Sequence, residues 1–167
     1  MKPLLLVDGY NVIGAWERVR REHLTHEEAR EALLHLLADY AGYSGQEIIV
    51  VFDGYKSGRR VRSEDMVSGV RVVFTMQGET ADNYIESMCD RTPRYREVRV
   101  ATSDGVEQTV TMGRGAVRIS SRELLIELSH VRRTGHVSHA QNGPRRNTVD
   151  SQLPEDVRSA LEKMRRQ

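Results

Sequence analysis

Residues 4–11 read LLLVDGYN, and this stretch is the strongest indication of the fold class. Four consecutive apolar residues are typical of a strand that is buried on both faces, as in a parallel sheet covered by helices. The chain then turns polar at once, with a carboxylate, a glycine that permits a tight turn, and an amide three residues after the carboxylate. Because open α/β sheets bind ligands at the carboxyl ends of their strands, this stretch predicts a functional site at the end of a buried first strand.

The same change from apolar to acidic residues recurs along the chain. Asp53 and Asp104 follow apolar runs as Asp8 does, and Asp82 opens a predicted helix after another such run. Carboxylates gathered at one edge raise one another's pKa unless a positive charge lies among them. Mg²⁺ and Mn²⁺ are hard cations that prefer oxygen ligands. The pattern therefore predicts a metal-dependent hydrolase.

Strands and helices alternate, which predicts an α/β fold with a mainly parallel central sheet and helices on both faces. Thr25 with Glu28 has the pattern of a capping box at the start of a helix, and Gly42 and Gly45 are expected to end that helix. The expected strands cover residues 3–8, 47–52, 70–75, 97–101 and 116–119. The expected helices cover a short stretch near 12–19, then 25–41, 80–91, 104–112 and 121–133.

The length of 167 residues allows one well-buried α/β domain but not two ordinary ones. Residues 134–152 are rich in Gly, Ser, Asn, Gln and Arg without an apolar period, and residues 153–166 have a helical pattern. We therefore expect one folded domain at residues 1–133, and a basic flexible segment with a C-terminal helix at residues 134–167.

Composition excludes several classes of protein. The single Cys89 rules out an internal disulfide and a multi-cysteine zinc site, which fits a reducing cytoplasm. No apolar run approaches the ~20 residues that span a bilayer, and the four apolar residues near the N-terminus are too few for the apolar core of a signal peptide. The phosphate-binding glycine loop of nucleotide hydrolases is absent. We expect a cytoplasmic protein that is not bound to a membrane and needs no nucleotide cofactor.

Charge is distributed unevenly along the chain. Residues 1–112 carry 14 basic and 18 acidic side chains, whereas residues 113–167 carry 11 and 6. Of the 25 basic residues 22 are Arg, whose planar fork of donors matches phosphate oxygens. A protein with an acidic metal-binding centre and Arg-rich segments beside it is suited to bind a polyanion close to the metal. Arginine on solvated helix faces explains the same composition equally well.

Helix capping and tight turns offer another explanation for each polar residue at a strand end. The residues to which this applies are Asp8, Asn11, Asp53, Glu79, Asp82, Ser103 and Asp104. Residues that each cap a different helix need not lie at one edge of the sheet, whereas the ligands of one metal ion must. Because these polar residues follow successive strands, their joint occurrence favours a shared site.

Five segments in a consistent order resemble a known family. They read LLLVDGYNVIGAW (4–16), VVFDGY (50–55), VVFTMQGETADNYIE (72–86), VRVATSDGVEQ (98–108) and SSRELLIEL (120–128). Over residues 3 to about 133 they resemble the YacP-like branch of NYN-domain proteins, relatives of PIN-domain nucleases. The resemblance implies a PIN-like three-layer sandwich, an Mg²⁺ or Mn²⁺ site and endoribonuclease activity. It also implies a link to the ribosome and to cleavage of translated mRNA.

The resemblance assigns the acidic site to Asp8, Asp82 and Asp104, with Asn11, Asp53 and Glu79 as neighbouring catalytic residues. We expect Asp8 and Asp104 to be direct metal ligands. Asp82 would bind a second ion or orient the attacking water, so all three are expected to belong to the metal site.

Arginines near the expected crevice are candidates for binding RNA phosphates, a contact that is independent of sequence and weakens with salt. They are Arg59, Arg60, Arg62, Arg114 and Arg118. Tyr10 and Tyr55, each two residues after a site aspartate, are candidates for stacking on bases, although packing within the protein explains them equally well.

Two other functions fit parts of the sequence. The chain could be an RNA- or ribosome-binding module with little or no intrinsic nuclease activity. An aspartate-type phosphatase is the third reading. It normally requires an acid two residues after the first-strand Asp8, where this chain has Tyr10, and a late lysine for which there is no candidate.

Overall fold

A computed structural model describes residues 1–54, 61–103 and 115–131, all within the compact unit Met1–Arg132. The helix expected at 104–112 and the flexible segment and helix expected at 134–167 lie outside the described residues. Within the described ranges, no helix combines the length and the apolar character that crossing a membrane requires.

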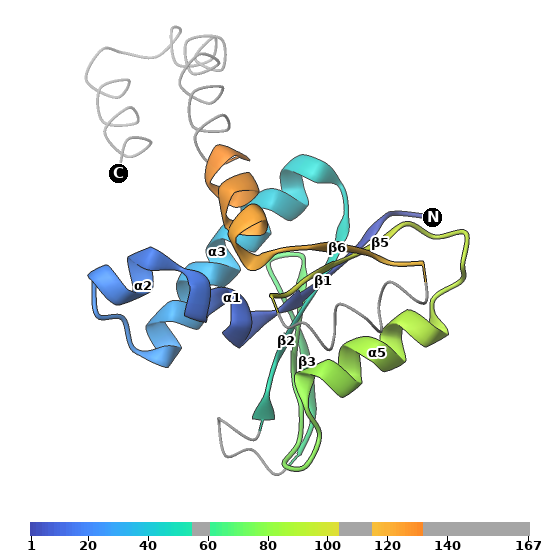
Figure 1. Cartoon of the computed structure of the whole chain (residues 1–167), viewed down its shortest axis with the longest axis horizontal. Coiled ribbons are helices and arrows are strands. Elements are labelled where there is room, and N and C mark those ends of the chain that lie inside the picture. Colours follow the sequence, from blue (N-terminus) through green and yellow to red (C-terminus); the bar gives the residue numbers. More distant parts are fainter. Residues whose placement is uncertain (55–60, 104–114, 132–167) are drawn as a thin grey trace, which may run out of the picture. The chain divides into compact units, whose positions relative to one another are not determined.

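Six strands of the described chain form one sheet with the order β3-β4-β2-β1-β5-β6 (Figure 1). All neighbouring pairs run parallel except β3 and β4, which are antiparallel. In the register, Asp8 lies opposite Val51 and Val7 opposite Ala101, so β1 ends between two other strand ends. The strands are β1 (Leu4–Asp8), β2 (Glu47–Phe52), β3 (Ser63–Val67), β4 (Val70–Phe74), β5 (Val98–Ala101) and β6 (Val117–Ile119).

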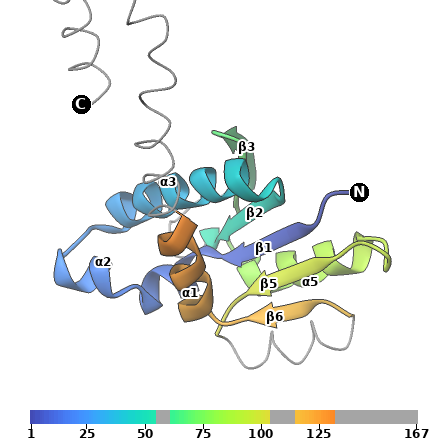
Figure 2. The same cartoon turned by 90° about the horizontal axis from the view of Figure 1, so that it is seen from above.

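Helices cover both faces of this sheet (Figure 1, Figure 2). The helices are α1 (Gly9–Ala15), α2 (Glu17–Arg21), α3 (His26–Ser44) and α5 (Ala81–Arg91), and residues 121–131 are also helical. One buried core joins α1, α3 and residues 121–131 to one face of the sheet, and a second core joins α5 to the other face. The three-layer α/β architecture expected from the sequence is confirmed.

Strand β1 shows why the sheet requires two helical layers. Leu5 and Val7 belong to the core under α1 and α3, whereas Leu4 and Leu6 belong to the core under α5. All four side chains are fully buried, and burying each leucine contributes about 1.5–3 kcal/mol to stability. A strand with apolar side chains on both faces is stable only when both faces are covered.

Helix α3 begins where the sequence predicts and ends later. Thr25 Oγ1 accepts from the backbone N–H of Glu28 at 3.1 Å, and Glu28 Oε1 accepts from the backbone N–H of Thr25 at 2.9 Å, so the capping box is confirmed. The expectation that Gly42 ends the helix is wrong. Gly42 lies within α3, and the left-handed C-cap is Gly45, with φ 70°.

Two further differences from the predicted elements have a physical reason. The short helix expected near 12–19 is two helices, α1 and α2, separated by the extended backbone of Trp16 (φ −87°, ψ 110°). Strand β3 was not predicted, because its residues are mostly exposed and polar. An edge strand paired on one side only needs no apolar period.

Candidate active site

The buried polar side chains of the described residues mark the carboxyl edge of the sheet. Asp8 is 8% exposed, and Thr75, Thr102 and Ser121 are fully buried. Asp8 ends β1, and the other three follow closely after β4, β5 and β6. Burial of polar groups is costly unless they are hydrogen-bonded, so these side chains are held by specific contacts.

Asp8 is held at this edge by the neighbouring strand. Thr102, which directly follows β5, donates its hydroxyl to Asp8 Oδ2 at 3.5 Å. Asp8 occupies the N-cap position of α1 but makes no capping hydrogen bond with its side chain. The alternative explanation of Asp8 as a helix cap is therefore wrong.

Asn11 joins three segments that are distant in the sequence. Its Oδ1 atom accepts from the hydroxyl of Ser121 at 2.6 Å and from the backbone N–H of Ser103 at 2.9 Å. The backbone N–H of Ser121 donates to the Ser103 hydroxyl at 3.3 Å. Asn11 therefore fixes the segment after β5 and the start of the helix at 121–131, and it does not cap α1.

Both Asp-Gly pairs require glycine because of close packing. A Cβ atom on Gly9 would lie 2.3 Å from a ring carbon of Phe52, and one on Gly54 would lie 1.4 Å from the carbonyl oxygen of Thr75. The backbone N–H of Gly54 also donates to Thr75 Oγ1 at 2.8 Å. Gly54 and Thr75 thus hold together the ends of β2 and β4, next to the half-buried Asp53.

Asp82 lies in the first turn of α5, whose N-cap is another residue. Thr80 Oγ1 accepts from the backbone N–H of Asn83 at 3.1 Å, so the capping role is already filled. Asp82 is half-buried and lies at the positive end of the helix dipole, which stabilises its carboxylate. The position of Asp82 therefore fits stabilisation by the helix dipole, and it also fits the predicted metal site.

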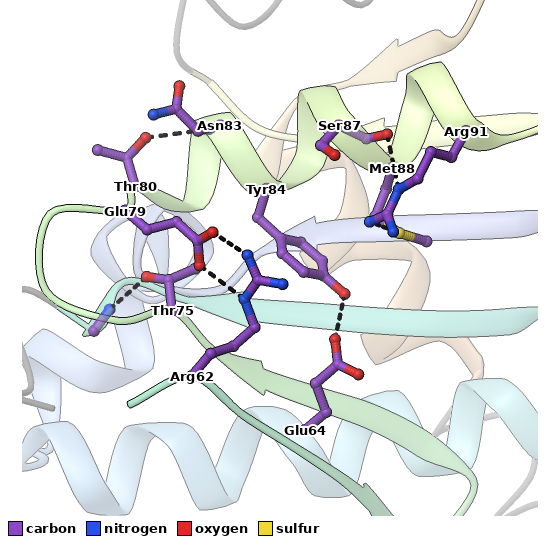
Figure 3. Close-up of polar contacts among 11 residues, drawn as sticks. Arg62, Glu64, Thr75, Glu79, Thr80, Asn83, Tyr84, Ser87, Met88 and Arg91 are labelled. Atoms are coloured by element: carbon purple, nitrogen blue, oxygen red, sulfur yellow. Dashed lines mark hydrogen bonds and ion pairs between the residues drawn. The ribbon is translucent and has the colours of Figure 1, made fainter. Parts of the chain in front are cut away.

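Glu79 and Arg62 were predicted to act separately, as a catalytic acid and an RNA-binding cation, and the structure pairs them (Figure 3). Arg62 Nε donates to Glu79 Oε1 at 3.0 Å, and a second guanidinium nitrogen contacts Glu79 Oε2. The hydrogen bond to Glu79 raises the pKa of Arg62. The pair ties the segment before β3 to the segment before α5.

The Arg62 guanidinium also lies over the ring of Tyr84, 5.3 Å from its centroid. Tyr84 donates its hydroxyl to Glu64 Oε1 at 2.8 Å. Burial and this hydrogen bond raise the pKa of Tyr84 to about 12. Arg62, Glu64, Glu79 and Tyr84 thus form one polar network between β3 and α5 (Figure 3).

Tyr10 and Arg118 have structural contacts of their own. Tyr10 is 9% exposed, its ring lies 5.2 Å from that of Phe52, and its hydroxyl accepts from Arg30 at 3.0 Å. Packing therefore accounts for Tyr10, and base stacking does not. Arg118 donates to the carbonyl oxygen of Thr102 at 3.3 Å. The other predicted residues, Tyr55, Arg59, Arg60, Asp104 and Arg114, lie outside the described residues.

The described residues do not by themselves complete a metal site. Among residues 1–54, 61–103 and 115–131, no three acidic, histidine or cysteine side chains lie close enough together to hold a metal ion. A three-carboxylate site built from the predicted set therefore needs Asp104.

The sequence did not single out Thr75, Thr102 or Ser121 as members of this site. These residues share one signal, because each is a small polar residue placed one or two positions beyond the end of a strand. That signal marks a position where the backbone leaves the sheet and a neighbouring strand end needs a hydrogen-bond partner.

Comparisons with known proteins agree with this architecture. The model of the YacP-like NYN domain matches residues 5–166, beyond the region that carries the resemblance in sequence. The protein YacP of Bacillus subtilis (strain 168) is 40% identical over 132 residues, which are 78% of this chain and 77% of that protein.

Two crystal structures of Rae1 (YacP) from Bacillus subtilis are also similar. One has a TM-score of 0.73 at 36% identity and covers 98% of this chain and 94% of the other. The second, of a mutant of that protein, has a TM-score of 0.71 at 33% identity and covers 96% and 99%. The PIN-like α/β fold is thereby confirmed. The chain belongs to the YacP-like NYN domain family, within the PIN-like nucleases, and has a nuclease-type role related to RNA.

Proposed function

We propose that this protein is an Mg²⁺- or Mn²⁺-dependent endoribonuclease that cleaves mRNA in the context of the ribosome. One observation carries the proposal furthest: a carboxylate, Asp8, is held almost fully buried at the carboxyl edge of a parallel sheet, where its side chain makes no capping hydrogen bond. Ligands of open α/β folds bind at this edge. Family membership supports RNA as the substrate.

The donor chemistry fits a hard divalent cation. Asp8, Asp82 and Asp104 offer carboxylate oxygens, the ligands that Mg²⁺ and Mn²⁺ prefer. When bound, the cation would lower the pKa of a water and neutralise charge on the scissile phosphate. Because the described residues hold no group of three such ligands, the proposal requires Asp104 to complete the set.

The chain's own residues have distinct parts in this proposal. Thr102 fixes the orientation of Asp8 through its hydroxyl. Glu79 holds Arg62 in place, so that Arg62 approaches a phosphate in one orientation. The remaining phosphate contacts are proposed for Arg59, Arg60, Arg114 and Arg118. The expected products are a 5′-phosphate and a 3′-hydroxyl.

Substitution of the acids tests the proposal. Asp8→Asn and Asp82→Asn should each abolish cleavage of a single-stranded RNA in Mn²⁺ and leave thermal unfolding nearly unchanged, because each change preserves side-chain volume. Asp65→Asn is the matched control, since Asp65 is exposed on the edge strand β3, and it should cleave at the wild-type rate. An Asp82→Asn protein that cuts RNA as fast as the wild type would refute the site assignment.

A binding module without intrinsic activity is the second candidate, and one contact favours it. Glu79, predicted as a catalytic acid, is paired with Arg62, which leaves this carboxylate less suited to a metal. Salt-sensitive binding to ribosomes with no hydrolysis in any divalent cation would support this candidate. Cleavage of naked RNA by the isolated protein would eliminate it.

A further inference from the structure

The carboxamide of Asn11 is oriented unambiguously by its partners. The backbone N–H of Ser103 can only donate, so the Asn11 atom that faces it at 2.9 Å is the oxygen and not the nitrogen. The fully buried hydroxyl of Ser121 donates to the same oxygen at 2.6 Å. The amide NH₂ group therefore lies on the other side of the carboxamide.

These two hydrogen bonds determine which chemistry Asn11 can offer. A carbonyl oxygen has two lone pairs, and Ser103 and Ser121 use both, so the oxygen has no lone pair left for a cation. Within the described part of the chain, no residue accepts a hydrogen bond from the NH₂ group. Asn11 is half-buried and lies in α1, which starts at the carboxyl end of β1, so this donor lies at the edge that Asp8 occupies.

We propose that Asn11 binds RNA as a hydrogen-bond donor, with its NH₂ group on a non-bridging phosphate oxygen, and that it is not a metal ligand. Ser121 is the positioning residue that keeps the NH₂ group turned toward the ligand. This inference rests on the proposed function for the identity of the ligand. Asn11, predicted from the sequence as a catalytic residue, thereby receives a defined role as a donor.

The variant Asn11→Asp separates the two roles of the carboxamide. An aspartate keeps an oxygen that accepts from Ser103 and Ser121, so the fold should be retained, but it has no NH₂ group. The added negative charge also weakens RNA binding by itself. Asn83→Asp is therefore the control, because it adds the same charge at an exposed position in the first turn of α5.

The measurement is the fluorescence anisotropy of a labelled single-stranded RNA, titrated with protein in EDTA so that no cleavage occurs. Asn11→Asp should bind at least about tenfold more weakly than Asn83→Asp, as expected for the loss of a hydrogen bond to a charged group. Equal affinities for the two variants would overturn the proposal. Wild-type protein that binds no RNA in this assay would overturn it too.

A double-mutant cycle tests the positioning role of Ser121. Ser121→Ala should weaken RNA binding in the wild-type background and have no further effect in Asn11→Asp, because Ser121 acts only through the amide. The same loss in both backgrounds would show a merely structural role and refute this part of the proposal.

Failure of this inference can be told apart from failure of the proposed function, since cleavage is measured separately. If the wild type cuts RNA in Mn²⁺ and Asp82→Asn does not, the nuclease proposal stands whatever the affinity of Asn11→Asp. If the isolated protein cuts no RNA, the binding comparison in EDTA still decides the role of Asn11.

Discussion

At the scale of single residues, the two Asp-Gly pairs show where sequence reasoning reaches the right residue for an incomplete reason. Gly9 was expected to let the backbone turn beside a ligand. In the structure its missing Cβ leaves room for the ring of Phe52, and that of Gly54 leaves room for the carbonyl of Thr75. Both contacts join segments far apart in the chain, so no local pattern could reveal them.

Gly54→Ala should therefore be strongly destabilising. Its Cβ would lie 1.4 Å from a backbone oxygen, and relief requires the ends of β2 and β4 to separate. We expect a loss of about 3 kcal/mol in the free energy of unfolding, at the upper end of the cost of overpacking. Urea unfolding followed by fluorescence of Trp16, the single tryptophan, measures it.

Gly14→Ala is the control for this prediction, because a Cβ there meets nothing within 4 Å. Because alanine is favoured over glycine within a helix such as α1, Gly14→Ala should raise the free energy of unfolding by about 0.5–1 kcal/mol. Equal stabilities of the two alanine variants would contradict the packing described for Gly54.

Tyr84 should ionise late, because burial and the hydrogen bond to Glu64 raise its pKa to about 12. The folded-state pKa lies above the ordinary value of about 10. The contribution to stability is therefore complete below pH 10 and is lost as the pH rises toward 12. Alkaline titration followed by tyrosinate absorbance should show a late-ionising group that Tyr84→Phe lacks. Tyr95→Phe, at an 80% exposed position, should retain this group.

At the scale of elements, the sequence located the start of α3 correctly, placed the end of that helix only in part and did not indicate β3. The capping box of α3 was predicted because both partners lie within one turn. Gly45 was correctly predicted to end the helix and Gly42 wrongly, since the sequence does not show which glycine adopts a positive φ. Strand β3 was missed because its pairing with β4 and the network around Tyr84 hold it in place, and no apolar period marks it.

Thr25→Ala should cost about 1 kcal/mol of stability, the usual effect of losing an N-cap. The hydrogen bond from the backbone N–H of Thr25 lowers the pKa of Glu28, and the hydrogen bond with the Thr25 side chain lowers it further. The stabilisation from Glu28 is thus present above its ordinary pKa and is lost as the pH falls through the lowered value. Ser87→Ala, exposed in α5, should leave urea unfolding nearly unchanged. No difference between the two variants would contradict the contribution of the cap.

At the scale of the whole molecule, the alternation of apolar strands and amphipathic helices was sufficient to predict the layered sheet and its carboxyl edge. The acids at that edge could be named from the sequence, but their partners could not. Thr102 holds Asp8, Ser121 holds Asn11 and Arg62 holds Glu79, through contacts made only after the chain folds. Asp104 and the arginines outside the described residues remain predictions.

Anomalous diffraction from crystals soaked in Mn²⁺ tests most directly whether the carboxyl edge is a metal site. We predict a peak within coordination distance of the carboxylate of Asp8, which disappears in crystals of Asp8→Asn. If crystals of the wild type show no peak at this edge, or bind Mn²⁺ only elsewhere, the proposal of a metal-dependent nuclease is contradicted.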